Sequence, residues 1–413
     1  MIPIRKRRAL AALGLVTGAA LALSACGGAS GSSGGATGSG LKILIGSSGD
    51  AETTAVKAAV KAWSQQSGVS ATVTAASDLN QELSQGFASG QPADVFYVSA
   101  DSFAGYASNG SLLAYGDKLS NRDDFYPSLV DQFSYGGKFY CAPKDFSTLA
   151  LVINTDDWAA AGLTDADIPT TWDQLSAVAA KLTTADRKGL VFNGEYARVG
   201  AFMAQAGGGM VNADGTKATV DSDANVQALT YVQQLLKSGN AAYASGVGAG
   251  WGGEAFGKNL AAMTIEGNWI KGSIEADYPN IKYRVVELPA GPKGRGTLQF
   301  TNCWGIAADS SLQNDAINLV SYLTATDRQI DFAKAFGVMP SVKSAANGYL
   351  SAFPEMAAFL NEADYAQNVV NIKGASDVIN DFNSQLEGLA TTDPKTILTS
   401  VQKNMQDLID SNK

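Results

Sequence analysis

The chain has 413 residues and a formal net charge of −9, and it contains no histidine. The lack of histidine excludes Ser-His-Asp and Cys-His catalysis and removes the commonest transition-metal ligand. An enzyme with this sequence would have to use carboxylates, lysines or tyrosines. The acidic composition argues against a nucleic-acid partner, because phosphate binding depends on Lys and Arg. Composition therefore favours a binding protein that uses neither a metal ion nor another cofactor.

The N-terminus has the three parts of a secretion signal. Residues 5–8 are basic, residues 9–22 are apolar, and small residues precede Cys26. The apolar run is about 15 residues long, shorter than the ~20 that a spanning helix needs, so we expect residues 1–25 to be a cleaved signal peptide. Residues 23–26 resemble a bacterial lipobox, which implies lipidation of the Cys26 sulfur. The alternative is a plain secreted protein with an incidental cysteine.

Residues 26–40 are expected to form a flexible tether, because they carry no charge and no large side chain. The folded body then begins near Leu41. Removal of residues 1–25 takes away four basic and no acidic residues, which leaves 26 Lys and Arg against 39 Asp and Glu and a net charge near −13. The remaining body of about 370 residues is long enough for two domains or two lobes.

The body opens with alternating strand and helix patterns. The expected elements are a strand at 41–45, a helix that stops at Gly68, a strand at 71–75, a helix from Asp78 to Gly90, and a strand at 94–98. This order predicts a parallel sheet covered on both faces. Ligands of such sheets lie beyond the carboxyl ends of the strands, so loops 47–50 and 99–102 are the first candidate site.

A second α/β region follows. A capping box at 171–174 opens a helix, and further helical patterns cover 224–237, 315–324, 327–336 and most of 377–408. This body contains two cysteines, Cys141 and Cys303. Outside the cytoplasmic membrane they could form a disulfide, and two buried free thiols are an equal alternative at this point.

Several stretches in one order resemble the carbohydrate-binding lipoproteins of bacterial ABC importers, the group similar to maltose-binding protein, in its actinobacterial form. The stretches are 93–97 with Asp101, 137–140, 143–145, 149–154, 169–175, 262–269, 304–308 and 337–340. The resemblance implies an α/β fold with two lobes, a type II periplasmic-binding-protein-like clamp. Each lobe would be a sheet flanked by helices, and hinge crossovers would join the lobes.

The resemblance also implies where the lobes lie in the sequence. One lobe would take 41–145 and 304–345, and the other would take 146–303 and 346–413. In this group the segments around Cys141 and Cys303 are neighbouring strands near the hinge, which favours a disulfide between them as a hypothesis. The implied partners are an oligosaccharide, the permease of an ABC transporter and, through the lipid anchor, a membrane. We expect a monomer.

Sugars offer apolar C–H faces and a rim of hydroxyl groups, so a sugar site combines aromatic platforms with polar acceptors and donors. Trp269 matches the stacking aromatic of the family and is the first candidate. Trp251 lies among glycines, and Trp304 lies at a lobe crossing. For each tryptophan, a place in the hydrophobic core is the alternative interpretation.

Polar candidates accompany these tryptophans. Asp101 matches a sugar-binding carboxylate of the family. The others are Asp50 on the first strand-end loop, Glu254 and Glu266 beside the tryptophans, Asp145, Ser147 and Asn302 near the crossings, and Glu195 with Arg198 in the second lobe. Surface carboxylates and hinge packing are the ordinary alternatives. The segment 195–198 lacks the aromatics of the maltose-binding pattern, which argues against a maltodextrin ligand.

Residues 248–253 match the pattern G-x-G-x-x-G of dinucleotide-binding loops. Neither an apolar strand before the match nor an acidic residue about 20 positions after it is present, so we interpret the segment as a flexible cleft loop.

The leading hypothesis is therefore capture of a neutral di- or oligosaccharide outside the membrane and its delivery to a permease, without catalysis. Closure of the lobes on the ligand would be the signal that the transporter recognises. A binder of a phosphorylated polyol, such as a glycerophosphodiester, would need positive charge in the cleft, for which Lys144 and Arg198 are available. An anchored glycosidase would need two carboxylates flanking one bond. An adhesin or a structural lipoprotein is the remaining alternative.

Overall fold

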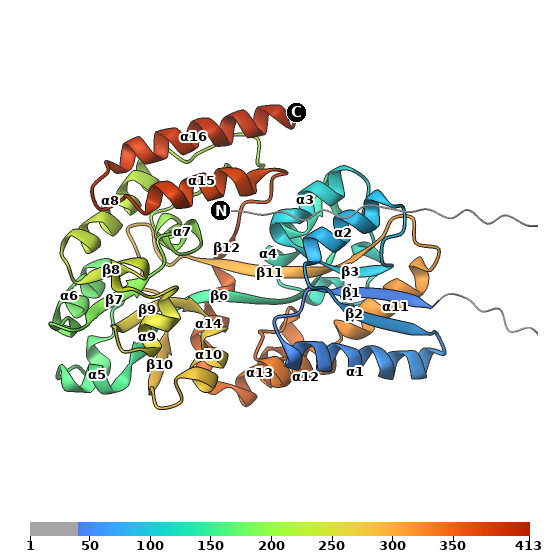
Figure 1. Cartoon of the computed structure of the whole chain (residues 1–413), viewed down its shortest axis with the longest axis horizontal. Helices are drawn as coiled ribbons and strands as arrows, with labels where there is room; N and C mark the ends of the chain where they lie inside the picture. Colours follow the sequence, from blue (N-terminus) through green and yellow to red (C-terminus); the bar gives the residue numbers. More distant parts are fainter. Residues whose placement is uncertain (1–39) are drawn as a thin grey trace, which may run out of the picture. The chain divides into compact units, whose positions relative to one another are not determined.

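The computed structural model describes residues 40–413, and a ten-stranded sheet runs through them in the order β2-β1-β3-β11-β6-β9-β7-β8 (Figure 1). The other two of the ten strands pair at the side of this order, β10 with β6 and β12 with β11. The signal peptide, Cys26 and the tether up to residue 39 lie outside the described residues. None of the helices formed by residues 40–413 has the length and apolar character that a bilayer span requires.

The strands and helices are as follows. The strands are β1 (Leu41–Ile45), β2 (Ala71–Ala75), β3 (Val95–Ser99), β4 (Ser134–Tyr135), β5 (Lys138–Phe139), β6 (Ala142–Asn154), β7 (Lys188–Phe192), β8 (Ala241–Tyr243), β9 (Ala261–Gly267), β10 (Tyr283–Val286), β11 (Thr297–Ile306) and β12 (Ala366–Asn368). The helices are α1 (Asp50–Ser67), α2 (Leu79–Ala88), α3 (Ala100–Ser108), α4 (Pro127–Gln132), α5 (Thr155–Ala160), α6 (Trp172–Leu182), α7 (Tyr196–Gln205), α8 (Asp223–Lys237), α9 (Gly252–Gly257), α10 (Ile270–Asp277), α11 (Gln313–Leu323), α12 (Thr326–Phe336), α13 (Ala346–Ala352), α14 (Ala357–Asn361), α15 (Ala375–Leu386) and α16 (Pro394–Ser411).

The predicted β-α-β-α-β start is confirmed. Strand β1 pairs in parallel with both β2 and β3. Helix α1 ends at Gly68, which adopts the left-handed conformation that favours glycine (φ 75°). The carboxylate of Asp78 caps α2 by accepting a hydrogen bond from the Gln81 N–H at 3.0 Å. These local signals position the loops after β1 and β3 at the same edge of the sheet.

The later helical predictions are also confirmed, with boundaries that move by a few residues. Helices α8, α11 and α12 match the patterns at 224–237, 315–324 and 327–336, and the expected C-terminal helix is divided into α15 and α16. Thr171 caps α6, as the capping box predicts. The apolar stripes of α8, α15 and α16 meet in one core, where Leu229, Phe382 and Met405 are fully buried.

Two large hydrophobic cores lie on either side of the crossing strands. The first contains residues of β1, β3, α1, α11 and part of α12, together with Cys141 and Cys303. The second contains residues of α6, α7, α8, β7, β9, α15 and α16. Figure 1 shows β6 and β11 running side by side from one group of elements to the other, and they pair antiparallel over Thr148 to Ala142. The chain passes between the two cores along each strand of this pair, and once more between Ala345 of the first core and Val378 of the second.

The crossing contains an irregularity and a covalent link. Asn302 pairs with Asp145, but Cys303 pairs with Pro143, so Lys144 is an extra residue on β6. Cys141 and Cys303, the expected pair, form a disulfide in the structure, with their Cα atoms 5.5 Å apart. The link joins β11 to the segment that leads into β6 beside the bulge.

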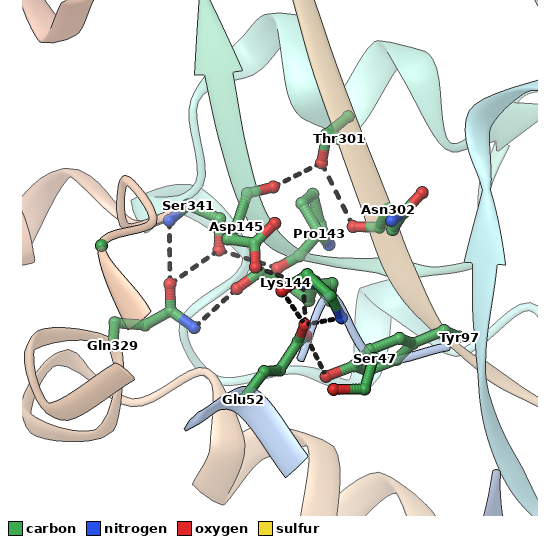
Figure 2. Close-up of polar contacts among 12 residues, drawn as sticks. Ser47, Glu52, Tyr97, Pro143, Lys144, Asp145, Thr301, Asn302, Gln329 and Ser341 are labelled. Atoms are coloured by element: carbon green, nitrogen blue, oxygen red, sulfur yellow. Dashed lines mark hydrogen bonds and ion pairs between the residues drawn. The ribbon is translucent and has the colours of Figure 1, made fainter. Parts of the chain in front are cut away.

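The side chain of Lys144 lies buried in a cluster of charged and polar groups (Figure 2). Its ammonium group lies 3.0 Å from Glu52 Oε1 and also pairs with Asp145, and it lies 4.8 Å from the centre of the Tyr97 ring. Burial alone would raise the pKa of Glu52, but the attraction of Lys144 and hydrogen bonds from Ser48 outweigh it and lower that pKa. One cation is therefore shared by two buried carboxylates.

The backbone around Lys144 is held by side chains, since the bulge removes it from the regular ladder. The Gln329 side-chain amide donates to the Lys144 carbonyl at 2.9 Å, and Ser341 Oγ donates to the Pro143 carbonyl at 2.7 Å. Thr301 Oγ1 donates to the Asp145 carbonyl at 2.6 Å, as Figure 2 shows. Every carbonyl from 143 to 145 is thereby satisfied.

Replacement of Cys141 and Cys303 by Ser should lower the free energy of unfolding by about 2–5 kcal/mol, because the disulfide closes a long loop in the unfolded chain. Denaturant unfolding measures the change. Thiol labelling of the unfolded, unreduced wild type should find neither cysteine free. Two labelled thiols, or a double variant as stable as the wild type, would contradict the expectation.

Lys144→Met should lower the free energy of unfolding by about 3–5 kcal/mol, because it leaves Glu52 and Asp145 buried without their cation. The difference from the wild type should shrink on acidification, as protonation neutralises the two carboxylates. Lys258→Met is the matched control, since Lys258 pairs with Glu254 at the surface and should contribute less than about 1 kcal/mol. Equal losses in the two variants, measured by denaturant unfolding, would refute a special role of Lys144.

Candidate ligand-binding site

A cavity of about 940 Å³ opens at the edge of the sheet where β1 and β3 end, next to the crossing strands. Its size is at the upper end of the ~300–1,000 Å³ of pockets for small molecules. It is lined by residues 46–52, 99–101, 144–147, 268, 269, 271, 272, 275, 300–302, 334–338, 353 and 369. The loops after β1 and β3, proposed from sequence as the first candidate site, supply one wall.

Six of the predicted site residues line this cavity. They are Asp50, Asp101, Asp145, Ser147, Trp269 and Asn302. Asp50 and Asp101 lie in the first turns of α1 and α3, where a carboxylate is favoured by the helix dipole. Burial raises the pKa of Asp145 above its usual range, although Lys144 partly offsets the effect. The three predicted carboxylates at the cavity thus come from three different elements.

Trp269 lies two positions after the end of β9 and, among residues 40–413, is one of two large hydrophobic side chains that are markedly exposed, at 39%. Its indole N–H donates to Glu266 Oε2 at 3.0 Å. The guanidinium carbon of Arg198 lies 5.3 Å from the ring centre, and the ring of Phe300 stands edge-on at 5.7 Å. The ring also closely approaches Gly267, where a Cβ atom would lie 2.2 Å from it. These contacts therefore hold the indole ring of Trp269 in place at the wall of the cavity.

Three of the other predicted residues form a cluster that contacts this indole through Glu266 and Arg198, without lining the cavity. Glu266 is fully buried (0% exposed) and accepts a hydrogen bond from Arg198 Nη2 at 2.6 Å. Arg198 Nη1 donates to Glu195 Oε1 at 3.1 Å. Burial outweighs the attraction of Arg198 and raises the pKa of Glu266. None of the three belongs to the cavity lining, and their expected contact with a ligand stays a prediction.

Three further predicted residues lie elsewhere. Trp304 is 1% exposed and packs edge-on against Tyr97 at 4.7 Å between ring centres, so it belongs to the core. Trp251 is half-buried and lies against Gly253, where a Cβ atom would come within 2.2 Å of the ring. Glu254 pairs with Lys258. The segment 248–253 leads into α9 and does not line the cavity, contrary to the expected cleft loop.

Sequence analysis missed several lining residues. Phe300, Phe336 and Phe353 add apolar surface, and Lys271 and Lys334 add positive charge. Lys271 is paired with Glu275 and Glu355. The only sequence signal was that Lys271 follows Trp269 by two positions; the others come from segments with no ligand motif of their own.

Asn268 links two walls of the cavity. Its backbone N–H donates to Ser147 Oγ at 3.1 Å, and its side-chain amide donates to the Gly337 carbonyl at 2.9 Å. These bonds connect the end of β9 with β6 and with the end of α12. Within residues 40–413, no group of three or more metal-ligating acidic or cysteine side chains is found. The lining offers stacking, hydrogen bonding and carboxylate acceptors.

Relatives of the chain carry names of binding proteins. A Brucella abortus protein named as a binding protein is 27% identical over 251 residues, which cover 58% of this chain and 56% of that protein. The chain thus spans about half the length of that curated relative. A diacetylchitobiose binding protein of Streptomyces coelicolor is 26% identical over 367 residues, 81% of this chain and 82% of that protein.

Solved structures share the fold. A cyclic α-maltosyl-1,6-maltose binding protein from Arthrobacter globiformis superposes with a TM-score of 0.80 at 20% identity, over 90% of this chain and 99% of the other. A Mycobacterium tuberculosis protein in complex with glycerophosphocholine superposes with a TM-score of 0.76 at 18% identity, over 91% and 100%. At these identities the likeness concerns the two-lobed α/β fold alone.

The sequence profile of the bacterial extracellular solute-binding proteins matches residues 58–361. These residues contain most of both cores, the crossing strands and Trp269. Because the match extends over well more than half of the sequence, this chain belongs to the family of bacterial extracellular solute-binding proteins.

Proposed function

We propose that the protein captures a neutral di- or oligosaccharide in this cavity and delivers it to the permease of an ABC transporter. The observation that carries the proposal is Trp269, an exposed and firmly held indole on the wall of a cavity that also presents carboxylates. A sugar ring can stack its C–H face on an indole while its hydroxyl groups donate to carboxylates. Asp50 and Asp101 are the acceptors that we assign to this role.

The charge of the cavity supports a neutral ligand. Lys144 is occupied by Glu52 and Asp145, and Lys271 by Glu275 and Glu355. Two of the three lysines in the cavity lining are thus compensated before any ligand arrives. The Streptomyces coelicolor and Arthrobacter globiformis relatives, each named for a saccharide, agree with this class of ligand.

The arrangement of the chain supports a hinged clamp. We propose that lobe 1 comprises 41–145 and 304–345 and that lobe 2 comprises 146–303 and 346–413, with the crossing of β6 and β11 between them. The two cores separated by that crossing agree with this division. Loops of the first lobe and Trp269 of the second would then close on the ligand from opposite sides, and the permease would recognise the closed form.

We further propose that residues 1–25 are a signal peptide and that a lipid on Cys26 anchors the protein to the outer face of the cytoplasmic membrane. The basic, apolar and small-residue segments of the N-terminus support this proposal, and so does membership of an extracellular family. Acyl chains on Cys26 would keep the binding protein near its transporter.

A glycerophosphodiester is the second candidate ligand. The Mycobacterium tuberculosis structure with glycerophosphocholine has the same fold, and Lys334 and Lys271 line the cavity. The two cations named for this role from sequence are both engaged, Lys144 in its buried cluster and Arg198 with Glu266. The saccharide therefore remains the first choice.

Tryptophan fluorescence should change saturably when maltotriose or diacetylchitobiose is added to the purified protein, because a stacked sugar alters the surroundings of Trp269. Glycerophosphocholine should produce no such change. A response to glycerophosphocholine alone would favour the second candidate. Chromatography of the incubated sugars should show them intact, and turnover would instead identify an enzyme.

Trp269→Ala should weaken saccharide binding by about ten-fold or more, a loss of ~1.4 kcal/mol or more of binding free energy. Trp251→Ala is the matched control, because this residue lies outside the cavity lining, and it should change the dissociation constant by less than about two-fold. Isothermal titration calorimetry measures both. Unchanged affinity in Trp269→Ala would remove this residue from the site.

A further inference from the structure

We propose that Arg198 and Glu266 are positioning residues that hold the indole of Trp269 as a preformed platform and do not themselves contact the ligand. The proposal rests on the saccharide-binding function proposed above, and it assigns a role to two buried charged residues that the cavity lining leaves out. Arg198 comes from α7 and Glu266 from β9, so the platform is held by two separate elements.

The indole edge is fixed by a hydrogen bond to a buried acceptor. Trp269 Nε1 donates to Glu266 Oε2 at 3.0 Å. Glu266 is fully buried, and its backbone is paired with Ala150 in the ladder between β6 and β9. An acceptor on a paired central strand has little freedom to move. Because the only N–H of the indole is taken, Trp269 offers its ring surface to a ligand and no hydrogen bond.

The ring is also held by the guanidinium group of Arg198, which lies 5.3 Å from its centre. The same guanidinium donates to Glu266 Oε2 at 2.6 Å and to Glu195 Oε1 at 3.1 Å. Its planar geometry allows it to lie against an aromatic ring while it makes hydrogen bonds to carboxylates. Both Arg198 and Trp269 thus donate to one oxygen of Glu266. This shared acceptor fixes the orientation of the guanidinium group relative to the indole ring.

The buried pair of Arg198 and Glu266 is not the arrangement that the stability of the fold by itself would favour. Glu266 Oε1 is buried and has no hydrogen-bond partner among the described residues. Buried ion pairs are often no better for stability than apolar residues of similar volume, and an unsatisfied buried oxygen is unfavourable. Glycine at 252 leaves room for this carboxylate, since a Cβ atom there would lie 2.7 Å from Oε1. The cluster is better explained by the orientation of Trp269.

The test is a double-mutant cycle with Arg198→Met/Glu266→Met, which removes both charges together, leaves neither buried alone and takes away the acceptor of the Trp269 N–H. The matched control is Arg187→Met/Asp157→Asn, because Arg187 and Asp157 form another mostly buried pair that does not line the cavity. The first readout needs no ligand. Acrylamide quenching of Trp269, taken as the difference from the same protein carrying Trp269→Phe, should increase in the Arg198/Glu266 variant and stay constant in the control.

The second readout is the affinity for maltotriose and diacetylchitobiose. The Arg198/Glu266 variant should bind about 2- to 30-fold more weakly, the range that corresponds to a lost cation–π contact. In a Trp269→Ala background the same pair of substitutions should change affinity by less than about two-fold. Arg198→Lys, which keeps the charge beside Glu266 but loses the planar contact, should fall between the variant and the wild type.

Two outcomes would overturn the proposal. Unchanged quenching of Trp269 in the Arg198/Glu266 variant would show that the pair does not hold the indole. An equal loss of affinity with and without Trp269 would show that the pair contacts the ligand directly. If no member of a panel of neutral di- and oligosaccharides that includes these two binds the wild type, the proposed function fails, but the quenching result still decides the positioning role. Thermal unfolding confirms that each variant is folded.

Discussion

The interaction on which the rest of the structure depends is the burial of one ammonium group, that of Lys144, between Glu52 and Asp145. Glu52 belongs to the helix that follows the first ligand loop, and Lys144 and Asp145 belong to a strand shared by the two cores. The attraction within this cluster therefore joins the cavity wall to the crossing. The Cys141–Cys303 disulfide reinforces the same place covalently.

The two walls of the cavity differ in chemistry. The loops after β1 and β3 present short polar side chains at helix starts, whereas Trp269 and phenylalanines line another part of the cavity. A hydroxyl-bearing ring needs both kinds of surface at once. Asn268 makes hydrogen bonds to Ser147 and to Gly337, so the segment that carries Trp269 is joined by specific bonds to β6 and to the end of α12.

Local signals in the sequence were sufficient to predict β1, β2 and, to within a few residues, most helix boundaries. Apolar periodicity and caps such as Asp78 act over only a few residues. The rule that ligands lie at strand ends correctly placed Asp50 and Asp101 at the cavity. The roles of Trp304 and Glu266 could not be found in this way. Whether a tryptophan or a glutamate faces a cavity or a core depends on partners distant in sequence, such as Tyr97 for Trp304 and Arg198 for Glu266.

The extra residue in β6 has a consequence for which sequence changes the crossing can accept. Residues that pair directly across antiparallel strands have their side chains on the same face, and a bulge places two residues of one strand opposite one residue of the other. Deletion of Lys144 would let Asp145 and Pro143 keep their partners on β11, but it would remove the cation that lies between Glu52 and Asp145. The extra residue and the identity of its side chain are therefore constrained together. Among relatives, insertions and deletions should be confined to loops outside residues 142–148.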